Sequence, residues 1–370
     1  MISAVIYGSL FALMAIGLTL TYLTTKVPNF AFGSFVAIGI YTAYTLFKVN
    51  SVSPYFSAAA SFLLAGVASV IMYLLVLKPL ARRGATLVSL MIATFGVDIG
   101  FVGILGIYLD YIANRFRLPD AHAFAPVRAD FMLFGISGIF FVAPVTLAVL
   151  TLALYLLLTR TKFGVAMRAA VENPPLAKVL GIDVERVYIV SWLIAGGLAG
   201  LAGSYHTLWL GGGTSTGSGL IVEIFASSIL GGLGSIYGAV LGGLTIGGSE
   251  IALTVYLVRG FGVLGTSILV GLLVLLGGYH LLKNRKRTRI LGAILVGISA
   301  YLAADVFLGF PLGFISRGLV NGFGAAAFIY QKGIPLLIMI ITLLFLPKGL
   351  IAIKFRRLLS LRRVKKNGPT

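Results

Sequence analysis

Long runs of apolar residues without a charged side chain recur along this chain of 370 residues. A helix needs roughly 20 apolar residues to cross a hydrocarbon layer of about 30 Å. Only 11% of the residues are charged, against about 25% in soluble domains. We therefore expect an all-α polytopic transmembrane helical bundle. The runs lie at about 2–25, 30–47, 55–77, 85–109, 134–158, 187–209, 221–257, 261–282, 290–310 and 333–347.

One transmembrane domain is expected over residues 1–350, with a basic cytoplasmic tail at 351–370. The first run lacks the basic leading segment of a signal peptide and is too long for one, so we expect it to remain as a span. The absence of cysteine excludes disulfides and cysteine-bound metal. The three histidines have no carboxylate at metal-ligand spacing, so we expect no metal site.

Basic residues gather in short clusters between the apolar runs, and this pattern predicts orientation. Short loops rich in lysine and arginine stay on the cytoplasmic side of a membrane. Residues 110–130 instead balance arginines against aspartates, which suits an outer loop. We expect a multi-pass protein of the cell membrane with its N-terminus outside and its C-terminus in the cytoplasm. The net charge of +19 thus indicates membrane orientation rather than nucleic-acid binding. The clusters lie at 78–83, 160–186, 283–289 and 348–366.

The run at 221–257 is too long for one crossing, because a helix of its length would span about 55 Å. The sequence Gly231-Gly232-Leu233-Gly234-Ser235 is the predicted break, since glycine is a poor helix former. A single net crossing would place the basic residues 283–289 outside, against the charge rule. The stretch near 221–240 therefore makes two crossings or is re-entrant, which leaves about 11 or about 9 spans open.

A short helix is predicted within the cytoplasmic loop 159–186. Asn173 is a favourable N-cap, Pro174 suits the first turn, and Gly181 suits a left-handed residue after the last turn. A helix of about seven residues is marginal alone and needs a surface to pack on. A partner protein, the lipid and the chain's own loops are alternatives for that surface. The apolar residues concerned are Leu176, Val179 and Leu180.

Ionisable residues inside the apolar runs are candidates for a translocation pathway, because they are unfavourable in lipid unless they face a cavity or a partner. Asp98 lies near the middle of its run and is the sharpest candidate. Glu223 and Asp305 could instead lie near the outer membrane–water interface. Glu250 could instead form a structural pair. Most glycine pairs four residues apart indicate close helix packing.

The residues alone leave two classes of transporter open. The chain has no phosphate-binding loop, so it should not hydrolyse ATP itself and would depend on a separate ATPase. The alternative is a stand-alone proton- or sodium-coupled secondary transporter using Asp98 or Glu250. An intramembrane enzyme is a third class, but Ser204 and His206 point to different sides of a helix and cannot form a nucleophile and base pair.

Ordered motifs make the chain resemble the permeases of bacterial and archaeal branched-chain amino acid ABC importers. The resemblance covers roughly residues 5–255 and 333–350. Its motifs are GLTLTY at 17–22, PNFAFG at 28–33, KPLARR at 78–83, IATFG at 92–96, FGVAMRAA at 163–170, LGIDV at 180–184, AGLAG at 199–203, GGLGSIYGAVLGG at 231–243, Glu250 and LPKGL at 346–350.

The resemblance implies a permease subunit that moves branched-chain or other hydrophobic amino acids by alternating access. It implies no cofactor in this chain, with ATP and Mg²⁺ bound by partner ABC ATPase subunits. The other implied partners are a second permease, identical or homologous, an extracytoplasmic substrate-binding protein and membrane lipid, but no nucleic acid. The chain departs from the family at Phe32, where histidine is frequent, at Asp98, where an uncharged residue is usual, and at 259–332, an expected insertion with two extra spans.

Two sets of site residues follow from these motifs and from the buried charges. The first set is expected to couple the chain to the ATPase and comprises Arg168, Ala169, Asn173, Pro174, Ala177, Leu180, Gly181 and Ile182. The second set is expected along the translocation pathway and comprises Asn29, Phe30, Gly33, Thr94, Gly96, Asp98, Gly231, Gly232, Gly234, Ser235 and Glu250.

Overall fold

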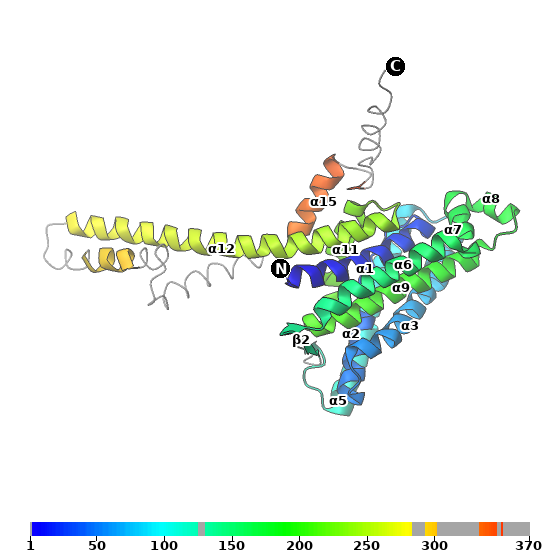
Figure 1. The fold of residues 1–370 in the computed structure, drawn as a ribbon, viewed down its shortest axis with the longest axis horizontal. Helices are drawn as coiled ribbons and strands as arrows, with labels where there is room; N and C mark the ends of the chain where they lie inside the picture. The colour runs from blue at the N-terminus through cyan, green and yellow to red at the C-terminus, as the bar shows by residue number, and fades with distance from the viewer. Residues whose placement is uncertain (1, 125–129, 283–292, 302–332, 346–348, 351–370) are drawn as a thin grey trace, which may run out of the picture. The chain divides into compact units, whose positions relative to one another are not determined.

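The structure is a computed structural model that describes residues 2–124, 130–282, 293–301, 333–345 and 349–350. It divides into two compact units, Met1–Gly248 with Pro335–Thr370, and Ser249–Ile334. Within the described ranges, 7 helices are long and apolar enough to cross a membrane, which confirms the predicted all-α polytopic bundle (Figure 1). The tail at 351–370, Asp305 and most of the predicted span at 290–310 lie outside the described residues.

Most of the described elements belong to the first unit, and the helical residues from Ser249 to Leu282 belong to the second. Before the loop at 117–138 they are α1 (Ile2–Thr25), α2 (Phe32–Asn50), α3 (Pro54–Met72), the π-helix η1 (Tyr73–Leu77), α4 (Lys78–Arg82) and α5 (Leu87–Phe116). Short strands follow: β1 (Ala123–Phe124), β2 (Met132–Leu133), β3 (Ile136–Ser137) and, after α9, β4 (Gly212–Gly213). The later helices are α6 (Ile139–Arg160), α7 (Lys162–Glu172), α8 (Pro174–Val179), α9 (Val184–Trp209), α10 (Thr216–Gly219), α11 (Ile221–Gly231), α12 (Ile236–Leu282) and α15 (Gly333–Phe345).

Helix α9 packs closely against its neighbours because glycines leave room for their backbones. A side chain at Gly200 would meet the backbone of Ser61 in α3, and one at Gly203 would meet the backbone of Val36 in α2. Small residues permit such close approach of helices within lipid. The predicted packing role of glycine is therefore confirmed on α9.

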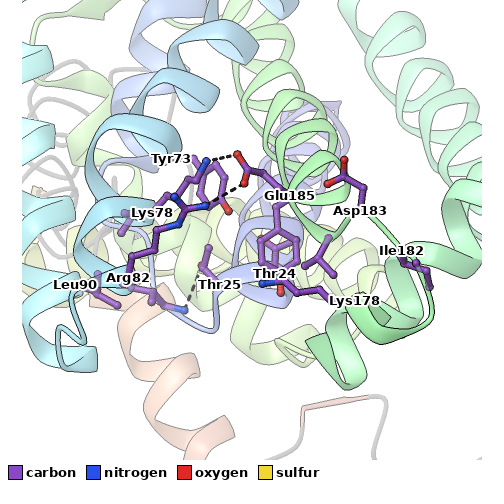
Figure 2. A pocket seen from close by; sticks show the side chains of 16 residues that line it. Thr24, Thr25, Tyr73, Lys78, Arg82, Leu90, Lys178, Ile182, Asp183 and Glu185 are labelled. Atoms are coloured by element: carbon purple, nitrogen blue, oxygen red, sulfur yellow. Dashed lines mark hydrogen bonds and ion pairs between the residues drawn. The ribbon is translucent and has the colours of Figure 1, made fainter. Parts of the chain in front are cut away.

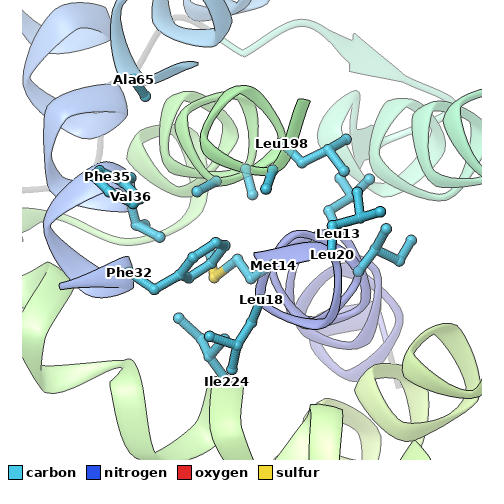
Figure 3. Packing of buried hydrophobic residues seen from close by; sticks show 14 of the residues in the cluster. Leu13, Met14, Leu18, Leu20, Phe32, Phe35, Val36, Ala65, Leu198 and Ile224 are labelled. Carbon is cyan, nitrogen blue, oxygen red and sulfur yellow. The ribbon is translucent and has the colours of Figure 1, made fainter. Parts of the chain in front are cut away.

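The hydrophobic core of this unit lies between α1, α2, α9 and α11. Met14 and Leu18 of α1, Phe32 of α2 and Ile224 of α11 are all buried. Figure 3 shows these side chains pointing toward one another. Phe32 also lies against Gly17, where a side chain would collide with its ring. The start of α2 is thus held beside the middle of α1.

The predicted break in the 221–257 run is confirmed. Helix α11 ends at Gly231, Gly232 has a φ of +99°, and α12 begins at Ile236. Glycine adopts this φ without the steric cost that other residues meet. The 11 residues of α11 span about 16 Å, roughly half of the hydrocarbon layer. A half-helix agrees with the re-entrant alternative and is too short for a full crossing.

Helix α12 differs from the prediction after residue 257. The apolar runs suggested separate helices that end at 257 and begin again at 261, whereas α12 is continuous over Ile236–Leu282. Arg259 and Gly260 do not interrupt it. The physical reason is that a single glycine inside a helix costs only about 1 kcal/mol, and no proline accompanies it.

The loop between α5 and α6 is bound to the ends of α2 and α3. Asp120 accepts hydrogen bonds from the Tyr44 hydroxyl at 3.0 Å and from Lys48 Nζ at 2.9 Å. Partial burial opposes ionisation of Asp120, but these two hydrogen bonds outweigh it and lower the pKa of the carboxyl. Asp130 accepts from the Tyr55 hydroxyl at 2.6 Å. Strand β1 pairs antiparallel with β4, which ties the same loop to the chain after α9.

The close contact at Gly200 predicts a large effect of side-chain volume. We expect Gly200→Val to lower the free energy of unfolding by about 1–3 kcal/mol or more, because the valine would force α3 away from α9. Thermal unfolding of the purified protein in detergent measures this effect. Gly100→Val is the matched control, since a side chain at Gly100 of α5 meets nothing within 4 Å. Equal shifts for both variants would contradict the packing argument.

Candidate functional site

A buried carboxylate near the middle of α5 is held by two serine hydroxyls from other segments. Asp98 is 7% exposed. Its Oδ1 accepts a hydrogen bond from Ser34 Oγ at 2.5 Å, and its Oδ2 accepts from Ser218 Oγ at 2.8 Å. Ser34 lies in the first turn of α2, and Ser218 lies in α10. We call these three residues the Asp98 cluster, and it joins segments that are far apart in the sequence.

The cluster forms because two glycines let α2 and α10 touch. A side chain at Gly33 would meet the backbone of Gly217, and one at Gly217 would meet the backbone of Gly33. This contact brings Ser34 and Ser218, the next residues in each segment, to the same side chain of α5. The predicted pathway residue Gly33 therefore has a packing role at the cluster.

The connection between α1 and α2 carries polar groups beside the cluster. The backbone N–H of Phe30 donates to Thr94 Oγ1 at 3.1 Å, one helical turn before Asp98. Asn29 Oδ1 accepts from the N–H of Ala31 at 3.1 Å. Asn29 Nδ2 is buried and has no hydrogen-bond partner among the described residues. A buried donor without a partner is unfavourable, so this amide is available to a ligand.

An apolar cavity of about 320 Å³ adjoins the same connection. Phe30 lines it and packs against Phe225 of α11, with ring centroids 5.2 Å apart. Met91 of α5 and Met339 of α15 are among the other residues that line it. Five predicted pathway residues thus lie close together, some at the Asp98 cluster and others beside the apolar cavity. They are Asn29, Phe30, Gly33, Thr94 and Asp98.

Other predicted pathway residues lie elsewhere. Gly234 and Ser235 line a second cavity of about 610 Å³ together with Lys26 and Arg168, at the opposite end of α11 from the Asp98 cluster. Gly231 and Gly232 belong to the same break. Gly96 faces open space, and Glu250 belongs to the second unit. The glycine break therefore lies beside Arg168 of the coupling segment. The helix α11 separates this break from Ile221 by about 16 Å.

The predicted coupling helix has the expected caps. Asn173 Oδ1 accepts from the N–H of Leu176 at 3.1 Å, and Pro174 is the first residue of α8. Gly181 has a φ of +78°, and the N–H of Ile182 donates to the carbonyl of Ala177 at 3.0 Å. These contacts confirm the start and the end of the helix that the sequence predicted.

One face of α8 is packed and the other is exposed. Ala177 is 1% exposed, so its side chain anchors the helix to the protein. Leu176, Val179 and Leu180 are 54%, 83% and 69% exposed. Leu176 and Val179 belong to α8 and Leu180 is its C-cap residue, and together they form an apolar surface without a partner in the described chain.

Two further residues predicted for coupling, Arg168 and Ala169, make hydrogen bonds to other parts of the same chain. Arg168 Nη1 donates to the carbonyl of Leu158 near the end of α6, and in this way Arg168 positions α7. Ala169 lies in the same helix and its carbonyl accepts from the N–H of Asn173 at 3.0 Å. Both residues hold the segment in place, and the exposed face of α8 lies beyond them.

Sequence reasoning missed Ser34, Ser218 and Phe225. Serine is common in membrane helices as a packing residue, so neither hydroxyl stood out. The signal that identifies them is the carboxylate of Asp98, which needs donors from other segments when it is buried. That requirement does not specify which of the many serines supply the bonds.

Comparison with known proteins gives a consistent result. Residues 1–277 match the family described as "Branched-chain amino acid transport system / permease component". The "Probable branched-chain amino acid transport permease protein LivH" of Methanocaldococcus jannaschii is 45% identical over 259 residues, which are 70% of this chain and 82% of the relative. The permease protein BraD of Pseudomonas aeruginosa is 27% identical over 250 residues, 64% of this chain and 80% of the relative.

A shorter stretch of the chain matches a permease from a different transport system. The "Autoinducer 2 import system permease protein LsrC" of Salmonella choleraesuis is 36% identical over 91 residues, 24% of this chain and 26% of the relative. No solved structure matches the chain.

The geometry of the Asp98 cluster predicts the cost of removing each donor. We expect Ser34→Ala and Ser218→Ala each to destabilise the protein by about 1–3 kcal/mol, because a buried carboxylate oxygen loses its hydrogen bond. Thermal unfolding in detergent measures the loss. Ser215→Ala is the control, since Ser215 precedes α10 and is exposed. Unchanged stability in both cluster variants would show that the hydroxyls do not hold Asp98.

Proposed function

The chain belongs to the family of permease components of branched-chain amino acid transport systems, and on that premise we propose which of its residues carry transport and coupling. It is the membrane-spanning permease subunit of an ABC importer. We propose that it moves branched-chain or other hydrophobic amino acids by alternating access. ATP and Mg²⁺ would bind to a separate ATPase subunit, which supplies the free energy.

The apolar cavity beside Phe30 supports a hydrophobic amino acid as the substrate. Its walls of aliphatic, aromatic and methionine side chains suit a branched aliphatic group. The amide of Asn29 and the carboxylate of Asp98 lie on the polar side of the same connection. In our proposal the side chain of the substrate passes the cavity while its charged groups pass the polar residues.

The exposed face of α8 is the observation that carries the coupling proposal. A capped helix of 6 residues is too short to be stable alone, and Leu176, Val179 and Leu180 are exposed at one side of it. Docking to an ATPase subunit would bury these side chains. The anchor at Ala177 would then pass the movement of the ATPase to the permease.

The distribution of charge supports the orientation of the bundle. Lys78, Arg82 and Lys178 line one cavity with the end of α1, so these basic residues lie at the same end of the bundle. The other end carries the Lys48–Asp120 ion pair, where the charges balance. By the charge rule, we propose that the basic end is cytoplasmic and that the N-terminus lies outside.

The same proposal includes the partners of the complete importer. Two permease subunits, identical or homologous, would form the membrane part, and an extracytoplasmic binding protein would deliver the substrate. The relatives are named as permeases of transport systems, which favours this assembly over the stand-alone secondary transporter.

Cysteine crosslinking tests the docking of α8, and the chain has no native cysteine to interfere. Single cysteines at Val179 and Leu180 should crosslink to cysteines on the ATPase subunit, with a yield that changes between the apo and the ATP-trapped complex. A cysteine at Ala177 is the matched control and should not react, since this position is buried. Absence of any crosslink along 173–182 in an active complex would refute the docking.

A second variant tests the pathway. Asp98→Asn keeps the shape of the side chain but removes its charge, so we expect it to reduce uptake by about tenfold or more, as for loss of a charged contact of at least 1.4 kcal/mol. Uptake into proteoliposomes that contain the whole importer measures this change. The α8 crosslink should persist in the variant, which separates a pathway defect from misassembly. Full transport by Asp98→Asn would remove Asp98 from the pathway.

A further inference from the structure

Glu185 joins the first turn of α9 to both ends of α4. Its Oε1 accepts a hydrogen bond from Lys78 Nζ, and its Oε2 accepts from Arg82 Nη2 at 3.3 Å (Figure 2). Lys78 begins α4 and Arg82 ends it, so the two cations lie on one face, one turn apart. We call these three residues the Glu185 clamp. Its single carboxylate is bonded to the first and the last residue of α4.

The clamp follows directly after the coupling helix. The N–H groups of Gly181 and Ile182 donate back to carbonyls of α8, at 3.0 Å each. Asp183 Oδ1 then caps α9 by accepting from the N–H of Arg186 at 3.1 Å. Only residues 180–183 separate α8 from α9, and hydrogen bonds fix their path. A displacement of α8 therefore reaches Glu185 without a flexible linker.

A second set of contacts joins α9 to α3 and η1 deeper in the bundle. Ser69 Oγ donates to the carbonyl of Trp192 at 2.5 Å, and the Tyr73 ring stacks on Trp192 with centroids 5.4 Å apart. Ser69 and Trp192 are fully buried. The clamp differs, because the side chains of Lys78, Glu185 and Arg82 are 20%, 42% and 69% exposed. The deep contact is thus shielded from solvent, whereas the clamp is accessible to it.

The clamp borders a cavity. A cavity of about 640 Å³ lies between α4, the start of α9 and the residues that follow α8. Lys78, Arg82 and Glu185 line it together with Lys178 of α8 (Figure 2). Across this cavity, the ion pairs of Lys78 and Arg82 with Glu185 join α4 to the start of α9.

We propose that Glu185 is a positioning residue that transmits the movement of α8 to α4. The proposal rests on the proposed function of α8 as the docking site for the ATPase. With the carboxylate present, α4 follows the start of α9. Without it, the deep contact keeps the fold, but α8 moves without carrying α4.

The test is the stoichiometry of transport to ATP hydrolysis. Glu185→Gln permease is reconstituted with its ATPase subunits and binding protein, and both activities are measured in the same proteoliposomes. We expect hydrolysis to continue while transport per ATP falls about fivefold or more, the lower end of typical coupling between sites. Glu185→Lys should have the same defect, and the exchange Glu185→Lys with Lys78→Glu should restore at least half of the ratio.

Arg186→Gln is the matched control, because Arg186 is 85% exposed and pairs only with Asp183 in the described structure. Its ratio should equal that of the unmodified importer. An unchanged ratio in Glu185→Gln would overturn the proposal, and so would an equal loss of both activities. If the Val179 crosslink to the ATPase forms and the ratio is unchanged, the clamp proposal alone fails. If the crosslink never forms, the docking function fails.

Discussion

Backbone groups that leave a helix inside a membrane must find partners within the protein, because the lipid offers none. The connection from α1 to α2 and the segment around α10 both interrupt helices of the bundle. In the first of them, the N–H of Phe30 donates to the Thr94 hydroxyl of α5. The mutual contact of Gly33 and Gly217 packs the second against the start of α2. The candidate pathway exists where the helices are broken and yet enclosed.

Sequence patterns predicted the membrane class and several local features, since each depends on residues close together in the chain. Apolar runs define spans by length, and Asn173 and Gly181 define the ends of α8 through the chemistry of caps. The break at Gly232 follows equally from local conformation. These features need no knowledge of tertiary contacts, and the structure agrees with them.

The arrangement of the sites could not be predicted in the same way. Ser34 and Ser218 meet Asp98 only because three segments converge, and no spacing along the chain encodes that contact. The glycine break, predicted along the pathway, lines a cavity with Arg168, and that neighbour depends on the direction in which α11 runs. Continuity of α12 through Gly260 shows that a weak helix former does not end a helix by itself.

Helix α11 has a mechanical consequence that follows from its length. It begins three residues after Ser218 and ends at Gly231, where Gly232 is left-handed. Its 11 residues form about three turns of hydrogen-bonded helix, which connect the glycine break beside Arg168 to the segment that carries Ser218. The cavity at the coupling segment and the Asp98 cluster are thus joined by one regular element, with no loop between them.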